Sequence, residues 1–99
     1  MERTEIERIF ESFFEKYKKT EGDRTSWSAV WTHMTDKGVL DLNMTKCPRG
    51  TTFKIFKDKK KIAQVIGWDA YFETMEKFQA EHPGLYDPDQ IFSDIEFSL

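Results

Sequence analysis

The side chains with the clearest chemical potential are five lysines within residues 52–67, TFKIFKDKKKIAQVIG. They are Lys54, Lys57, Lys59, Lys60 and Lys61. Ammonium groups gathered on a hairpin bind phosphate oxygens, and such binding weakens steeply as salt rises. The same pattern is typical of a solvated hairpin tip, where lysine discourages aggregation along a strand edge. The segment therefore predicts either a nucleic-acid contact or a solvent-exposed loop.

Carboxylates dominate the last third of the chain, where residues 63–99 hold eight acidic side chains and one basic side chain. Five of these acids are Glu73, Glu76, Asp87, Asp89 and Asp94. Carboxylate oxygens bind calcium and magnesium, but the spacing of an EF-hand loop is absent, and Asp87 and Asp89 fit helix caps. We therefore expect no metal and no cofactor, and we interpret the acids as contacts for a basic protein partner.

A single cysteine, Cys47, and two histidines are the remaining reactive residues. In the hairpin described below, His33 and Asp41 become cross-strand neighbours, and Cys47 follows them in the sequence. Cysteine catalysis requires a nucleophile, a base and an acid that converge in a cleft around a thiol of lowered pKa. The segment CPRG shows no such feature, and the common catalytic and nucleotide-binding motifs do not occur. The sequence therefore argues against an enzyme.

The composition predicts one folded domain over residues 1–99. Aromatic residues make up 15% of the chain, well above a disordered composition, and 99 residues support a single core. The sequence contains neither a long apolar run nor a signal-peptide pattern, so we expect no membrane segment. One cysteine cannot form an internal disulfide, which favours a reducing, cytoplasmic setting.

An amphipathic helix is predicted from about Thr4 to Glu21, because apolar side chains recur there at three- and four-residue spacing. They are Ile6, Ile9, Phe10, Phe13, Phe14 and Tyr17. Thr4 and Glu7 match a capping box at its start, and Gly22 suits its end.

Residues 26–44 admit two interpretations. A helical stripe ended by Gly38 is one, formed by Trp27, Val30, Trp31 and Met34. A hairpin with the loop Asp36-Lys37-Gly38 is the other, and it pairs Val30 with Met44 and Met34 with Leu40. We favour the hairpin, because tryptophan, valine and threonine prefer strands and one face becomes mostly apolar.

This hairpin register puts Trp31 opposite Asn43, so that Trp31 and His33 lie on the outer sheet face. An exposed tryptophan beside polar neighbours is typical of an interface anchor. The alternative is that Trp31 belongs to the core, beneath one of the C-terminal helices.

Residues 52–67 predict a second hairpin, in which a three-residue loop at 58–60 sets Ile55 opposite Ala63 and Phe53 opposite Val65. A helix follows from about Asp69 to His82, and a short closing helix follows Asp87, with Pro88 at its first position.

Together these elements predict an α+β fold: an N-terminal helix, a four-stranded antiparallel sheet of two hairpins, then a helix and a short C-terminal helix packed on the sheet. We interpret the protein as a small intracellular protein-binding module, an inhibitor or adaptor of the type that phages and mobile elements encode. The alternative is nucleic-acid binding through the basic 54–61 hairpin. An exposed sheet edge leaves a homodimer open.

Overall fold

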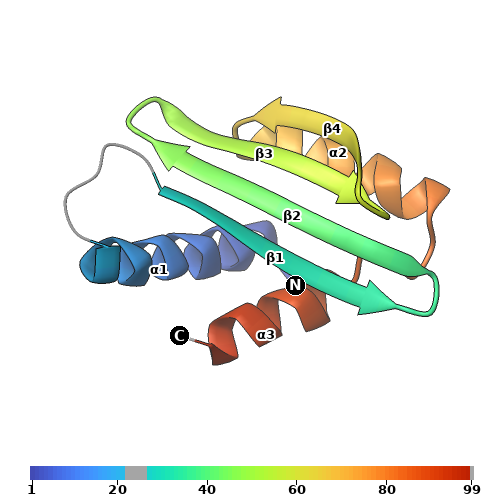
Figure 1. Cartoon of the computed structure of the whole chain (residues 1–99), viewed down its shortest axis with the longest axis horizontal. Coiled ribbons are helices and arrows are strands. Elements are labelled where there is room, and N and C mark those ends of the chain that lie inside the picture. Colours follow the sequence, from blue (N-terminus) through green and yellow to red (C-terminus); the bar gives the residue numbers. More distant parts are fainter. Residues whose placement is uncertain (22–26, 99) are drawn as a thin grey trace.

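The computed structural model describes residues 1–21 and 27–98, without the side chains of residues 17–21 and 27. The elements, shown in Figure 1, are α1 (Arg3–Glu21), β1 (Trp27–Thr35), β2 (Gly38–Cys47), β3 (Gly50–Lys57), β4 (Lys60–Ile66), α2 (Trp68–Glu81) and α3 (Pro88–Phe97). This order confirms the predicted α+β fold and the strand interpretation of residues 27–35. The predictions for Gly22 and for the side chains of Tyr17 and Trp27 lie outside the described residues.

The four strands form one antiparallel sheet in the order β1-β2-β3-β4, so each strand pairs with its neighbour in the sequence. Figure 1 shows α2 behind β3 and β4, and α1 and α3 on the side of β1. The inner face of the sheet, against the helices, carries five fully buried side chains: Leu40, Leu42, Met44, Phe53 and Ile55. Because side chains alternate along a strand, the intervening residues form the opposite, outer face.

The core between sheet and helices centres on the ring of Phe10, from α1. Its centroid lies 4.8 Å from that of Phe92 and 5.2 Å from that of Trp68. Phe53 of β3 stacks on Tyr71 of α2 with 4.4 Å between centroids. One aromatic cluster therefore joins all three helices to the middle of the sheet, which is where large rings contribute most to stability.

The first hairpin differs from the prediction by one residue. Thr35 pairs with Gly38, so the loop contains only Asp36 and Lys37, and Trp31 pairs with Leu42 instead of Asn43. A shift of one residue exchanges the two faces of a strand. Trp31 consequently packs against the core, and the predicted outer-face position of Trp31 and His33 is wrong. Val30, 58% exposed, and Met34, 75% exposed, occupy the outer face instead.

The second hairpin also has a two-residue loop, Asp58 and Lys59, instead of the predicted three residues. Both loop residues have positive φ, 50° and 70°, as the tight hairpin turn that matches strand twist requires. A register shift of one residue between Ile55 and Phe56 then compensates for the shorter loop. Ile55 therefore faces Ala63 as predicted. The predicted pairing of Phe53 with Val65 is likewise confirmed.

The helix boundaries lie close to those predicted, but Thr4 is inside α1 and not at its N-cap, so the predicted capping box of Thr4 and Glu7 is wrong. α1 begins at Arg3, one residue before the predicted start, and α2 begins at Trp68, with Gly67 and not Asp69 at the cap position. His82 is the C-cap of α2. Asp87 caps α3 as predicted, because its side chain accepts a hydrogen bond from the backbone N–H of Gln90.

Candidate functional site: the outer face of the sheet

The outer face of the sheet is covered by none of the described helices, which all lie on the inner face. Its outward positions hold small polar residues, a few apolar side chains and two lysines. The apolar members are Val30, Met34, Val39, Phe56 and Ile66. An interface that forms and dissociates is about as apolar as the rest of a protein surface, so this mixture fits a binding surface.

A shallow hollow of about 340 Å³ lies in the middle of this face. It is lined by Val30, Thr32, Asp41, Asn43, Phe56 and Lys59. Asp41 is 7% exposed and accepts a hydrogen bond from the hydroxyl of Thr32, with 2.5 Å between the oxygens. The ammonium group of Lys59 lies 3.5 Å from the other carboxylate oxygen. A buried charge must be paired, and these two contacts supply that pairing.

The sequence did not single out this hollow. Thr32, Asp41 and Asn43 meet there only because the register pairs Thr32 with Asp41 and Val30 with Asn43. Phe56 joins them across β2 and β3, where it pairs with Asp41. The alternation of polar residues along β2 was the available signal, since Asp41 and Asn43 interrupt an otherwise apolar segment.

The five lysines of the second hairpin do not form a single basic patch. Lys54 lies on the outer face in mid-strand, whereas Lys57 belongs to the inward positions of β3 and pairs with Asp58 at 2.9 Å. Lys59 turns back to Asp41, and Lys61 donates a hydrogen bond to Gln64 at 3.1 Å. The lysines around the tip therefore divide between the two sides of the sheet.

The five acids named in the sequence are distributed over two helices. Asp87 caps α3, Asp89 binds the N-terminal amine at 2.6 Å, and Glu73 lies 3.8 Å from Lys77. The hydrogen bond that this amine donates to Asp89 raises the pKa of the amine. Glu76 and Asp94 form no ion pair with the residues that the structure describes. Structural roles thus account for three of the five acids.

His33, Asp41 and Cys47 are not brought together. His33 pairs with Leu40 on the inner face, whereas Asp41 lies on the outer face, so the predicted cross-strand pair of His33 and Asp41 is wrong. Cys47 pairs with Gly50 at the far end of β2, where its thiol donates a hydrogen bond to the Gly50 carbonyl. Within residues 1–21 and 27–98 no three metal-ligating side chains gather at one place.

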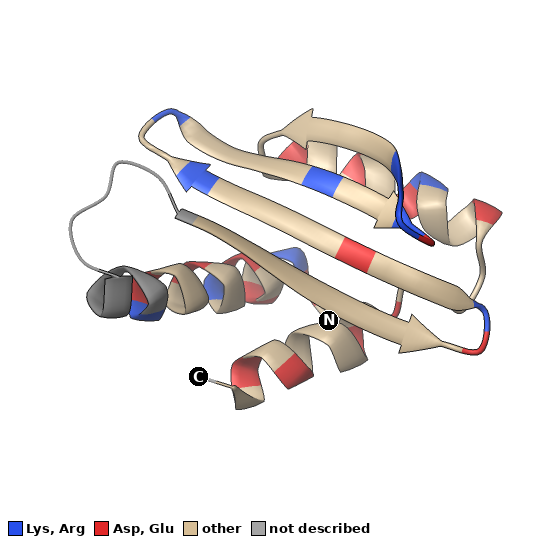
Figure 2. Cartoon of the chain, in the orientation of Figure 1, with Lys and Arg blue, Asp and Glu red and all other residues tan. Residues whose placement is uncertain are grey.

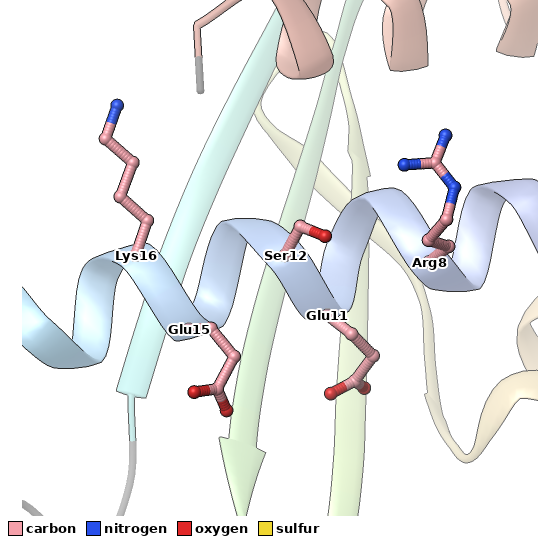
Figure 3. A pocket seen from close by; sticks show the side chains of 5 residues that line it. All are labelled: Arg8, Glu11, Ser12, Glu15 and Lys16. Atoms are coloured by element: carbon pink, nitrogen blue, oxygen red, sulfur yellow. The ribbon is translucent and has the colours of Figure 1, made fainter.

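A second hollow, of about 440 Å³, lies along α1 and is lined by Arg8, Glu11, Ser12, Glu15 and Lys16. Figure 3 shows Arg8 and Lys16 pointing to one side of the helix and the two glutamates to the other. Arg8 donates to Glu96 at 2.7 Å, and Lys16 donates to the carbonyl of Ser98 at 2.9 Å. Glu11 accepts a hydrogen bond from Lys46 of β2. These charged groups hold α1 against α3 and the sheet, which gives this hollow a structural explanation.

Charge differs between strands β2 to β4 and the two C-terminal helices, whereas α1 carries acids and bases in equal number. Residues 36–62, which run from the first hairpin loop into β4, hold eight bases and three acids, while residues 63–99 hold one base and eight acids. Figure 2 shows mostly lysines and arginines along β2, β3 and the hairpin tips, mostly acids along α2 and α3, and both kinds along α1. Strands β2 and β3 of the outer face therefore belong to the basic part of the chain.

Comparisons with known proteins add no assignment to this geometry. No helix of the described chain is long and apolar enough to cross a membrane. No family model, no curated protein and no solved structure matches the sequence or the fold.

Proposed function

We propose that this protein is a small protein-binding module that binds an acidic surface of a partner protein on the outer face of its sheet. The single observation that carries the proposal is the uncovered outer face with its central hollow. Val30, Met34 and Ile66 are between 58% and 75% exposed there, and burial of such side chains drives protein association.

Charge on the outer face indicates the kind of partner. Lys54 and Lys61 are on outward positions of β3 and β4, and Asp41 is the one carboxylate at an outward strand position in the described sheet. Asp41 is already paired with Thr32 and Lys59. The face thus presents unneutralised positive charge around apolar side chains, and complementary potentials favour an acidic partner surface. Binding of this kind is sufficient for an inhibitor or an adaptor, because neither needs to catalyse a reaction.

The proposal is tested by reversing the charge of the outer face. The variant Lys54→Glu with Lys61→Glu is immobilised and used to capture partners from a nuclease-treated extract, beside the wild-type protein. Its matched control is Arg49→Glu with Lys77→Glu, which changes the net charge equally at exposed positions away from this face. We expect the outer-face variant to lose a protein that wild type and control both retain. Equal retention by all three proteins would reject this surface.

Nucleic-acid binding through the basic 54–61 hairpin is the second candidate function. It is favoured by one observation, the run Lys59-Lys60-Lys61 at a tight turn, where all three side chains are exposed. Lys59→Glu with Lys60→Glu should then abolish a salt-sensitive change in fluorescence polarisation of a single-stranded oligonucleotide. Wild-type protein that leaves the polarisation unchanged at low salt would exclude this function.

A further inference from the structure

The two edges of the sheet differ in the features that prevent edge-to-edge association. β4 begins with two lysines, Lys60 and Lys61, and a register irregularity interrupts its pairing with β3. β1 is nine residues long, WSAVWTHMT, and contains no lysine, arginine, aspartate, glutamate or proline. Its pairing with β2 is continuous over all nine residues. Lysines and irregular pairing protect exposed edges, and β1 has neither protection.

The free edge of β1 also presents apolar side chains. Val30 and Met34 lie on its outward positions, 58% and 75% exposed, and β2 is the only described strand that pairs with it. Alternate residues of an edge strand point their N–H and C=O groups away from the sheet, where another strand can pair with them. β1 therefore combines unpaired backbone groups with uncovered apolar surface.

We propose that β1 pairs antiparallel with β1 of a second copy of this chain, so that two sheets join into one of eight strands. A two-fold axis through Thr32 puts each Val30 opposite Met34 of the second copy, on the outer face. On the inner face the same axis puts Trp31 opposite His33. Residues 29–35 of both strands then pair, and directly opposed side chains of this kind stabilise an antiparallel pair.

A second copy of this chain is compatible with this edge in charge and in symmetry. The chain carries a net charge of −3, yet no charged side chain opposes another across residues 29–35 in the self-pairing. The spacing of Val30 and Met34 around Thr32 is self-complementary, as an interface with two-fold symmetry requires. Seven paired residues bury less than the roughly 1,200 Å² of a stable interface, so the dimer should dissociate on dilution.

Sedimentation over a range of concentrations tests the association. We expect wild-type protein to form a dimer as its concentration approaches about 1 mM, the range in which weak complexes are populated. Met34→Lys should abolish the dimer, because a lysine on an edge strand opposes strand pairing and the apolar contact with Val30 is lost. The matched control is Ile66→Lys, which introduces the same charge on the same face at a residue 72% exposed on the opposite edge. The control should dimerise like wild type, and circular dichroism verifies the fold of both variants.

Cysteine cross-linking tests the register. In a Cys47→Ser background, Val30→Cys and Met34→Cys proteins are oxidised separately and as a mixture. The proposed axis predicts disulfide-linked dimers from the mixture and few from either protein alone, because residue 30 meets residue 34 and not itself.

Three results would overturn the proposal. These are a monomer at every concentration, equal loss of the dimer in the Met34→Lys and Ile66→Lys variants, and cross-links that form as readily within one cysteine variant as in the mixture.

The proposed partner binding is separable from this test. Residues 54 and 61 lie on β3 and β4, outside the paired strand. The variant Lys54→Glu with Lys61→Glu should therefore lose the partner protein but still dimerise.

Discussion

Thr32 and Asp41 lie directly opposite each other on β1 and β2, and the hydroxyl of Thr32 donates a hydrogen bond of 2.5 Å to the Asp41 carboxylate. Asp41 is 7% exposed, so this bond pairs a carboxylate that water reaches poorly. The contact exists only in the observed register, because a shift of one residue moves Thr32 away from Asp41.

Loss of the Thr32 hydroxyl should therefore destabilise the fold. We expect Thr32→Val to lower the free energy of unfolding by about 1.5–3 kcal/mol, the range for hydrogen bonds to charged groups. Urea denaturation measures the change. Ser28→Ala is the control, since it removes a cross-strand hydrogen bond to Thr45 that is exposed to solvent. An equal effect of both variants would show that the burial of Asp41 is unimportant.

Trp31 should contribute more to stability than its neighbour Val30. Trp31 packs against the core from the inner face, whereas Val30 is 58% exposed on the outer face. We expect Trp31→Ala to cost about 2–4 kcal/mol and Val30→Ala less than about 0.5 kcal/mol. Urea midpoints of the two variants provide the measurement. The opposite ranking would support the register with Trp31 on the outer face.

The buried hydroxyls of Tyr71 and Tyr86 form a pair, with 3.1 Å between the oxygens. Removal of one hydroxyl leaves the other buried without its partner, so Tyr86→Phe should cost about 1–3 kcal/mol. The double change to phenylalanine removes both groups and should be nearer to wild type. A double-mutant cycle in urea measures this coupling. If the losses of stability in the two single variants added up to the loss in the double variant, the two hydroxyls would not be coupled.

The same pair predicts instability at alkaline pH. Burial raises the pKa of Tyr86 to about 12, and it raises the pKa of Tyr71 well above its ordinary value. Because the folded pKa values exceed the unfolded ones, the stabilisation is complete below about pH 10 and is lost as the pH rises further. We expect the urea midpoint to fall between about pH 10 and pH 12, and to fall less in the double phenylalanine variant. If the urea midpoints of wild type and the double phenylalanine variant fell equally with rising pH, the tyrosine pair would not be the cause of the instability.

Asp58 predicts a loss of stability in acid. The hydrogen bond from Lys57 lowers the pKa of Asp58, and a second hydrogen bond from the backbone N–H of Val39, at 3.0 Å, acts in the same direction. Since the folded pKa is below the unfolded one, the stabilisation is present at neutral pH. It is lost as the pH falls through the folded pKa.

Replacement by Asn keeps a residue that tolerates positive φ and removes the titration. We expect the urea midpoint of Asp58→Asn to fall less than that of wild type between about pH 7 and pH 3. Lys57→Met removes the main cause of the pKa shift and should reduce the difference between the two profiles. If Lys57→Met left the difference between the two pH profiles unchanged, a group other than Lys57 would be lowering the pKa of Asp58.

The two hairpins show why register was the least predictable feature. Both loops have two residues where three were expected, which moves each register by one. In the second hairpin the shift between Ile55 and Phe56 cancels the error, so Ile55 still faces Ala63. β1 and β2 pair without an irregularity, so there the error persists and exchanges the faces of β1. Sequence pattern alone does not show where an irregularity lies, because it depends on packing against the helices.

The sequence by itself determined the elements and their order. Three- and four-residue spacing marked the helices, Asp87 and Pro88 marked the start of α3, and paired apolar segments marked both hairpins, since these signals act over a few neighbouring residues. Tertiary structure alone decided which face of β1 is buried. That strand has large apolar residues on both faces, and burial of Trp31 against the inner face beside Leu42 left Val30 and Met34 exposed. The candidate surface follows from which face of β1 is buried. The register of the strand, and not the type of residue, decides on which face of the sheet a side chain lies.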